Sequence, residues 1–173
     1  VNIKKIKDIA GNSSDVLVNE FITGGINCAL LCCEGMVSTS VISELVLNPI
    51  TGILQKSSSA ELFAYITDKL LLSIDRPTAT EYGTLFRLLN SGFAILIAEG
   101  SGEALAFGVQ GYSVRGIQEP SSEGNIMGAH EGFVEQVRTN MSLLRRRLKS
   151  PELVMELFVK GKRSKTDICL CYM

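Results

Sequence analysis

Residues 111–149 read GYSVRGIQEPSSEGNIMGAHEGFVEQVRTNMSLLRRRLK, and this stretch decides how the rest of the chain is divided. Glycine, proline and serine interrupt its first half, whereas its second half carries apolar residues at steps of three and four. Such steps place side chains on one face of a helix. The stretch therefore predicts an irregular connector followed by a long helix that ends at Pro151. The apolar stripe of this helix consists of Phe133, Val134, Val137, Met141, Leu144 and Leu148.

Charges at the two ends of the expected helix support this prediction. Glu131 and Glu135 lie in or near its first turn, and Arg145–Arg147 lie in its last turn. Acidic groups near the amino end and basic groups near the carboxyl end stabilise a helix through its dipole. Because the apolar stripe is expected to be buried, replacement of Phe133 or Leu144 by alanine is predicted to cost about 2–5 kcal/mol of stability.

Composition limits the class of protein. The chain has 173 residues, of which 46% are hydrophobic and 20% are charged, so we expect one globular domain or two small subdomains. Its net charge of −1 comes without a concentrated basic face, which argues against a nucleic-acid-binding module. No apolar run approaches the roughly 20 residues that span a bilayer, and the sequence shows no signal peptide. Because the chain opens on Val1 and stops at Met173 inside an alternating apolar run, we expect it to be a piece of a longer protein.

The remaining pattern alternates between helical and extended segments. Helices are predicted at 3–10, 15–23, 40–47, 58–74 and 78–89, and strands at 26–33, 93–98, 104–110, 153–160 and 166–172. Ser40 is the expected cap of the third helix, and Pro49 is expected to stop it. The segments 58–61 and 78–81 each match a capping box, which opens a helix.

Together these segments predict an α/β fold in which helices pack on small mixed sheets in two subdomains. The first subdomain covers residues 1–112, and the connector covers 113–130. The central helix and the final hairpin, residues 131–173, begin a second α/β subdomain that is truncated at Met173.

The five cysteines indicate a structural role. Cys28, Cys32, Cys33, Cys169 and Cys171 lie in apolar, strand-like runs, and none shows the CxxC spacing of a zinc site. We therefore predict five buried, reduced thiols that behave as small hydrophobic side chains, with no metal ion. Reduced cysteines favour a reducing compartment such as the cytosol.

Residues with catalytic chemistry are scarce, so neither enzyme activity nor a cofactor is predicted. His130 is the only histidine, and no serine or cysteine lies in a recognisable nucleophile motif. Gly100 and Gly102 join two expected strands, whereas a phosphate-binding loop joins a strand to a helix. The run Arg145–Arg147 has two interpretations, which are dipole matching at a solvated helix end and a grip on a phosphate or lipid headgroup.

Function is indicated by motifs at fixed spacing. From Arg115 the chain reads R-x-I-x-E-P-x-x-E, from Gly128 it reads G-x-x-E-G-F-x-E, from Thr139 it reads T-N-x-x-L-L-R-R-R, and from Ser164 it reads S-K-T. These motifs resemble the signature of the GerA family, the A subunits of bacterial spore germinant receptors. Weaker similarity extends upstream to 12–15 and 34–35. The residues for which the resemblance implies a structural or assembly role are Arg115, Glu119, Pro120, Glu123, Gly128, Glu131, Gly132, Phe133, Asn140, Arg145, Arg146 and Arg147.

The resemblance implies the soluble N-terminal module of a germinant receptor A subunit, which acts in nutrient sensing and in the receptor assembly that triggers spore germination. It implies two partners, a transporter-like B subunit and a lipoprotein C subunit. It places the parent protein in the spore inner membrane through segments outside this fragment, and the reduced cysteines favour the cytoplasmic (spore core) side for this domain. It also implies two α/β subdomains similar to bacterial solute-binding proteins.

Two alternatives and one hypothesis complete the expectations. A small-molecule binding module would hold the germinant in the cleft between the subdomains, and an enzyme fragment would need a reactive cysteine or His130. We further hypothesise that Arg145 or Arg146 grips Glu119 or Glu123 in the connector and so sets the angle between the subdomains. Because a planar guanidinium binds a carboxylate through two parallel hydrogen bonds, lysine would not substitute there.

Overall fold

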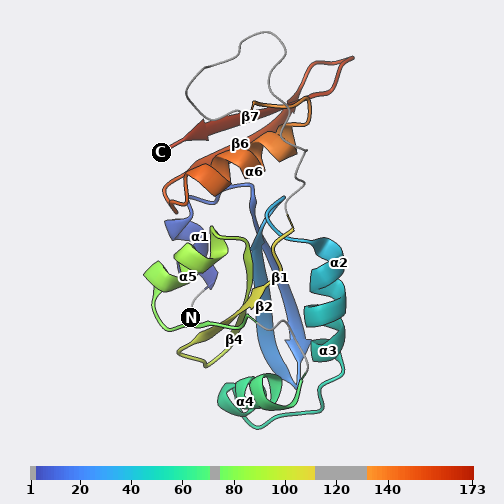
Figure 1. Ribbon diagram of the computed structural model, residues 1–173, viewed down its shortest axis with the longest axis vertical. Helices are drawn as coiled ribbons and strands as arrows, with labels where there is room; N and C mark the ends of the chain where they lie inside the picture. Colours follow the sequence, from blue (N-terminus) through green and yellow to red (C-terminus); the bar gives the residue numbers. More distant parts are fainter. Residues whose placement is uncertain (1–2, 71–74, 112–131) are drawn as a thin grey trace.

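The computed structural model describes residues 3–70, 75–111 and 132–173. Within these ranges the chain forms a five-stranded sheet with helices on both faces and a separate two-stranded hairpin packed on one helix (Figure 1). The hairpin and its helix lie at one end of the elongated molecule, beyond the end of the sheet. The fold is therefore α/β, as the sequence predicts.

Every strand pairing among the described residues is antiparallel. The order in the five-stranded sheet is β1-β2-β4-β5-β3, with strands at Val16–Thr23, Ile26–Cys33, Phe93–Ala98, Ala104–Gly108 and Thr78–Ala79 in that order. The prediction of mixed sheets is therefore wrong. The connections from β1 to β2 and from β4 to β5 are too short for the crossover that parallel strands require.

The central strands are buried on both faces, which divides the core into two clusters. All residues of β4 are buried, and successive side chains of a strand alternate between the two faces. Helices α1 (Ile3–Ile9) and α5 (Tyr82–Leu89) cover one face. The helical segment 39–51 and α4 (Ser59–Lys69) cover the other.

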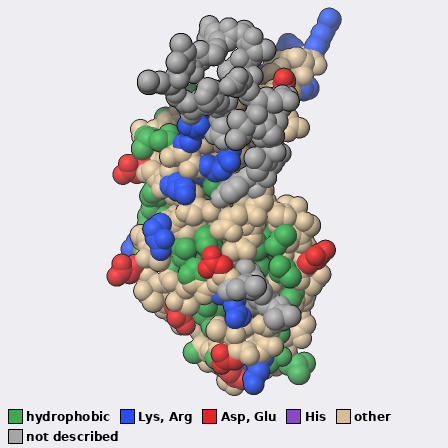
Figure 2. Space-filling model, viewed as in Figure 1, with side chains coloured by type: hydrophobic (Ala, Val, Ile, Leu, Met, Phe, Trp, Pro, Cys, Tyr) green, Lys and Arg blue, Asp and Glu red, His purple; other side chains and the backbone are tan. Residues whose placement is uncertain are grey.

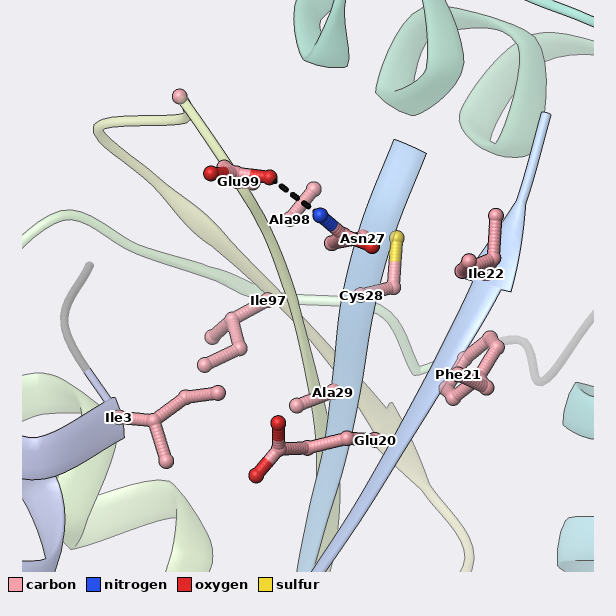
Figure 3. Close-up of a pocket in the computed structure, with 11 residues that line it drawn as sticks. Ile3, Glu20, Phe21, Ile22, Asn27, Cys28, Ala29, Ile97, Ala98 and Glu99 are labelled. Atoms are coloured by element: carbon pink, nitrogen blue, oxygen red, sulfur yellow. Dashed lines mark hydrogen bonds between the residues drawn. The ribbon is translucent and has the colours of Figure 1, made fainter. Parts of the chain in front are cut away.

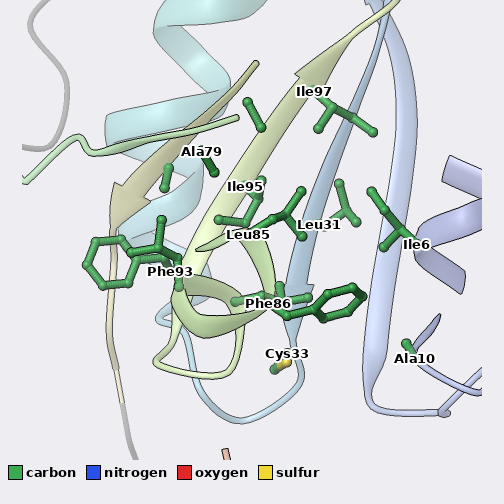
Figure 4. Packing of buried hydrophobic residues seen from close by; sticks show 14 of the residues in the cluster. Ile6, Ala10, Leu31, Cys33, Ala79, Leu85, Phe86, Phe93, Ile95 and Ile97 are labelled. Carbon is green, nitrogen blue, oxygen red and sulfur yellow. The ribbon is translucent and has the colours of Figure 1, made fainter. Parts of the chain in front are cut away.

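Side chains from distant segments meet in the first cluster (Figure 4). Ile6 of α1 and Phe86 of α5 pack in it together with Leu31 of β2 and Ile95 of β4. Burial of one such side chain stabilises a fold by roughly 1.5–3 kcal/mol. The sheet and its helices thus have a core of their own, separate from the small cluster under the hairpin.

Residues 16–23 form strand β1, so the helix predicted at 15–23 is wrong. β1 pairs along its whole length with β2, whose apolar residues need a neighbour on each side. The turn at Gly24 and Gly25, with φ of 57° and 77°, returns the chain directly onto β1. Strand pairing thus overrides the apolar spacing that suggested a helix.

The helical segment 39–51 runs through Pro49, where the sequence predicts a stop. Its cap is Ser38 instead of Ser40, because the Val41 N–H donates to the Ser38 hydroxyl at 3.4 Å. The segment comprises α2 (Thr39–Ile42), the π-helical η1 (Ser43–Leu47) and α3 (Asn48–Thr51). Proline lacks the N–H that an α-helix needs and crowds the preceding turn, so the wider π-helical turn lets the helix continue.

The first of the two predicted capping boxes is present with one change, because Glu61 bonds the N–H of Ser57 in place of that of the cap residue Ser58. The Glu61 N–H donates to the Ser58 hydroxyl at 3.2 Å, and the Glu61 carboxylate accepts from the Ser57 N–H at 2.8 Å. Helix α4 therefore begins where predicted. The second box is wrong, because Thr78 pairs with β5 as part of β3 and α5 begins only at Tyr82.

The carboxyl-terminal part consists of α6 (Val137–Arg147) and the hairpin of β6 (Val154–Lys160) and β7 (Thr166–Tyr172). This hairpin and the β4–β5 hairpin are both confirmed predictions. Met141, Leu153 and Met155 form a small core between α6 and the hairpin. Among the described residues, no helix combines the length and apolar character that crossing a membrane requires.

Helix α6 begins later than predicted, and its apolar stripe is only partly buried. Phe133 is 69% exposed and Leu148 is 43% exposed, so the prediction that they are buried is wrong. The Asn140 side chain explains the late start. Its Nδ2 donates to the Val134 carbonyl at 2.7 Å and its Oδ1 accepts from the Val134 N–H at 2.8 Å, which holds the preceding segment outside the helix.

Leu31→Ala is expected to destabilise the chain by about 2–5 kcal/mol, because the side chain is completely buried in the first cluster. Leu17→Ala removes the same atoms from a residue that is 44% exposed on the edge strand β1, and is expected to cost less than about 1 kcal/mol. Urea unfolding followed by circular dichroism measures both losses. Equal losses would contradict the position of β1 at the sheet edge.

Candidate functional site

A buried arginine joins α6 to the five-stranded sheet. Arg145, in the last turn of α6, is 1% exposed, and so is Asp15, which immediately precedes β1. Arg145 Nε lies 2.8 Å from Asp15 Oδ2, and Nη2 lies 2.9 Å from Asp15 Oδ1. These two parallel hydrogen bonds form the bidentate geometry for which a guanidinium is suited and an ammonium is not.

The rest of the guanidinium binds backbone. Arg145 Nη1 donates to the Ser150 carbonyl at 2.9 Å, and Nη2 also donates to the Leu153 carbonyl at 2.8 Å. A buried charge is tolerated when it is paired and its hydrogen-bonding groups are satisfied, and here each side-chain nitrogen atom of Arg145 has an acceptor. One side chain thus links the sheet, the helix and the chain that leads into β6.

Two serines before β1 complete this contact. Ser13 Oγ donates to Asp15 Oδ1 at 2.5 Å and accepts from the Met155 N–H at 2.8 Å. The Ser14 N–H donates to the Met155 carbonyl at 2.8 Å, and the Leu157 N–H donates to Ser14 Oγ at 3.3 Å. The loop before β1 therefore lies alongside β6 and satisfies part of its backbone.

A second contact connects α6 to the turn after β2. Arg138 forms an exposed ion pair with Glu34. Gly35, with φ of +71°, lies so close to Ser142 that an added Cβ would be 2.9 Å from the Ser142 Cβ. A side chain at this glycine would push α6 away from the sheet. The residues of both contacts, called here the helix–sheet joint, are Ser13, Ser14, Asp15, Glu34, Gly35, Arg138, Ser142 and Arg145.

The surface charge differs between the two parts of the molecule (Figure 2). On this face, basic side chains gather on the upper part, where α6 and the hairpin lie, and acidic side chains are spread around the five-stranded part. The charge of Arg145 contributes nothing to this surface because the side chain is buried. Salt therefore screens the surface charges much more strongly than it screens the ion pair inside the joint.

The predicted site residues differ in where the structure places them. Arg145 belongs to the joint, where it pairs with Asp15. The connector glutamates of the hypothesis, Glu119 and Glu123, lie outside the described residues, so that hypothesis stays a prediction. Asn140 shapes the start of α6, Arg146 is half-buried and Arg147 is exposed. The remaining two described residues, Gly132 and Phe133, are on the surface. The residues outside the described ranges are Arg115, Glu119, Pro120, Glu123, Gly128, His130 and Glu131.

Sequence reasoning missed Asp15 as the partner of Arg145. The two residues are 130 positions apart, so no periodic pattern connects them. One signal was available, because the upstream segments 12–15 and 34–35 resemble the same family as the arginine run. Both segments contribute residues to the joint.

The cysteines are free thiols, and two of them are strongly shielded. Burial raises the pKa of Cys28 to about 11. Burial, followed by the Asp15 carboxylate, raises the pKa of Cys33 to about 12. Both thiols are also buried away from solvent, and because the thiolate is the reactive form, they are inert at neutral pH. Cys32, Cys169 and Cys171 are half-buried, so the prediction that all five are buried is wrong for these three.

A cavity of about 710 Å³ opens at the end of the sheet opposite the joint (Figure 3). Ala29 and Ile97 supply apolar lining, and Glu20 and Glu99 supply carboxylates. Asn27 Nδ2 donates to Glu99 Oε2 at 2.7 Å. An apolar wall beside two carboxylates suits a small organic cation better than an anion.

Comparison with known proteins identifies the family. The model of the Bacillus/Clostridium GerA spore germination protein matches residues 4–173, which is nearly the whole chain. The chain belongs to the GerA family. The resemblance predicted from the motifs is thereby confirmed.

Several GerA relatives match along the whole chain. Spore germination protein KA of Bacillus subtilis (strain 168) is 33% identical over 175 residues, which cover 99% of this chain and 32% of the relative. Spore germination protein B1 of the same organism is 31% identical over 176 residues, covering 99% and 36%. The membrane protein YfkQ, also from that organism, is 28% identical over 173 residues, covering 99% and 33%. The chain thus spans about a third of the length of these curated relatives.

A solved GerA structure matches the fold. The N-terminal domain of the A subunit of the Bacillus megaterium spore germinant receptor GerK3 superposes with a TM-score of 0.70 at 25% identity. The match covers 99% of this chain and 62% of that chain. The sheet, its helices and the hairpin described above therefore belong to the architecture of a GerA N-terminal domain.

Asp15→Asn is expected to destabilise the chain by about 3–5 kcal/mol, because it leaves the Arg145 charge buried without its counter-ion. Arg138→Met, which removes the exposed partner of Glu34, is expected to cost about 0–1 kcal/mol. Chemical unfolding measures both changes, and high salt should weaken only the second pair. A small loss for Asp15→Asn would mean that the buried pair does not hold the joint.

Proposed function

We propose that this GerA chain is the N-terminal module of a spore germinant receptor A subunit, acting in nutrient sensing and in the receptor assembly that triggers germination. The observation that carries the proposal is the helix–sheet joint, because it unites the family-like segments 12–15, 34–35 and 139–147 in one structure. Similarity to the GerK3 domain over 99% of this chain supports it. The joint fixes the orientation of α6 relative to the five-stranded sheet, which is a structural role that suits a receptor module.

The joint acts as a rigid coupling between the two parts of the chain. A rotation of α6 would separate Arg145 from Asp15 and from the Ser150 and Leu153 carbonyls at the same time. Because separating a buried ion pair is costly, a displacement of one part is passed to the other. In the receptor this coupling keeps partner-binding surfaces on the two parts in a fixed relation.

The proposed setting is a receptor complex in the spore inner membrane. We place this module on the spore core side and name the B and C subunits as its partners, with membrane segments elsewhere in the parent protein. The relative YfkQ is itself described as a membrane protein, and the relatives are about three times the length of this chain. The free cysteines support a reducing compartment.

The proposed domain division has residues 1–112 as the first subdomain, 113–130 as a connector and 131–173 as the start of a second subdomain, in the manner of solute-binding proteins. The hairpin supports this division because its outer face exposes several apolar side chains. Phe158, Ile168 and Leu170 on that face are 36%, 40% and 53% exposed. The GerK3 domain is longer than this chain, which covers 62% of it. In the proposal, chain beyond residue 173 covers this face and completes the second subdomain.

Small-molecule binding is a second candidate function, and the cavity beside β1, β2 and β4 favours it. Its volume of about 710 Å³ lies within the range of about 300–1,000 Å³ that is typical of ligand sites. Glu20 and Glu99 select for a positive group, such as the ammonium of an amino compound. This cavity lies within the five-stranded part, so it differs from the cleft between subdomains that the resemblance suggests.

Arg145→Lys in the full-length receptor subunit is expected to lower the amount of the subunit in spores severalfold and to slow nutrient-triggered germination. The reason is that lysine cannot bind Asp15 through two parallel hydrogen bonds. Arg163→Lys, at an exposed position between β6 and β7, is the matched control and should leave both unchanged. Immunoblots of spore membranes and the fall in optical density measure the two effects. Normal level and normal germination of the Arg145→Lys spores would refute the role of the joint.

Calorimetric titration with amino acids, their amides and sugars tests the second candidate. We expect heat with apolar amino compounds and none with sugars, and we expect Glu20→Gln to weaken binding by about fivefold because it removes one partly solvated charge. Glu44→Gln, on the far helical segment, is the control. Absence of heat with every compound would eliminate the cavity as a ligand site and leave the proposal based on the joint untouched.

A further inference from the structure

Four sulfur-bearing side chains meet in the small core between α6 and the hairpin. Met141 of α6 and Met155 of β6 are buried there, and Cys169 and Cys171 of β7 pack against them. Met155 lies directly opposite Cys171 in the strand register, so the two side chains project from the same face. The Sγ atoms of the two cysteines are 3.5 Å apart.

The strand geometry disfavours a disulfide bond between these cysteines. Residues two apart in an extended strand have Cα atoms roughly 6.4–6.8 Å apart, which is at the upper end of the range of about 4.4–6.8 Å that a disulfide spans and above its usual value of about 5.5–6 Å. β7 pairs with β6 from Thr166 to Tyr172, so bending it to bring the thiols together would break that pairing. An ion that bridges the two sulfur atoms needs no such change.

The separation of the sulfur atoms suits a bridging metal ion. An ion bound to both sulfur atoms, which are 3.5 Å apart, through bonds of about 2.3 Å would have a sulfur–ion–sulfur angle of about 100°. This angle is near the tetrahedral value. Zinc would need further Cys, His or carboxylate ligands, and within residues 3–70, 75–111 and 132–173 no group of three or more such side chains is arranged to hold a metal. The neighbouring donors are thioethers, and a set of thiols and thioethers selects Cu(I).

We propose that Cys169 and Cys171, supported by the thioethers of Met155 and Met141, form a binding site for a soft monovalent metal ion of the Cu(I) class. Binding replaces thiol protons by metal–sulfur bonds, releases those protons to solvent and changes no oxidation state. Both cysteines are half-buried, so an ion can reach them from solvent.

The elements around the site determine what binding does to the fold. The donors come from α6, β6 and β7, so a bound ion ties all three elements together next to the joint. The metal-bound chain therefore melts at a higher temperature than the metal-free chain.

Anaerobic titration of the 173-residue chain with Cu(I) held by the chromophoric chelator bicinchoninate tests the site. The chain is expected to take up one Cu(I). Cys169→Ala and Cys171→Ala each remove a direct ligand of the ion. Because removal of an outer-shell partner alone lowers metal affinity by up to about 100-fold, each of these variants is expected to lower the Cu(I) affinity by at least about 100-fold. Met155→Leu, which conserves side-chain volume, is expected to lower it by about 10-fold.

Cys32→Ala is the matched control, because Cys32 is also half-buried but lies on β2, away from the sulfur cluster. It should bind Cu(I) like the unmodified chain. Melting of each metal-free variant identifies any that does not fold, and Cys169→Ser or Cys171→Ser then takes its place. Failure of the chain to remove Cu(I) from the chelator would overturn the proposal. So would equal losses of affinity in Cys32→Ala and Cys169→Ala.

Discussion

The carboxyl-terminal part of the molecule depends on the buried ion pair between Asp15 and Arg145. Each charge would be costly to bury alone, and the Ser13 hydroxyl and the carbonyls after α6 make it possible to bury them together. The cluster under the hairpin, built on Met141, Leu153 and Met155, is too small to fix α6 by apolar contact alone. Apolar packing therefore builds the five-stranded part, whereas a polar contact determines where α6 and the hairpin lie.

This division gives a physical meaning to the motifs that identify the GerA family here. Within T-N-x-x-L-L-R-R-R, Asn140 fixes where α6 begins and Arg145 fixes what it binds. The upstream segments supply the complementary surface, with a carboxylate at Asp15 and a position at Gly35 that leaves room for Ser142. Residues that looked like separate short matches along the sequence are parts of one contact.

Local signals in the sequence predicted much of the fold, and long-range contacts account for the rest. The apolar run of β2, the two later hairpins and the Ser58 cap of α4 are encoded within a few residues, and the structure confirms them. The sequence predicts a helix where β1 forms because the apolar residues of 16–23 do not alternate strictly, and only pairing with β2 makes this segment a strand. The partner of Arg145 and the residues that line the cavity come from segments far apart in the chain, which no local pattern can relate.

The 130-residue separation of Asp15 and Arg145 also has a consequence for the order of folding. During synthesis the amino-terminal strands emerge first, so the Asp15 carboxylate must stay hydrated until α6 leaves the ribosome. Closing so long a loop is slow, and its entropic cost is met only when the guanidinium displaces that water. Docking of α6 therefore follows formation of the sheet, and a nascent chain that stalls before residue 145 lacks the arginine that pairs with Asp15.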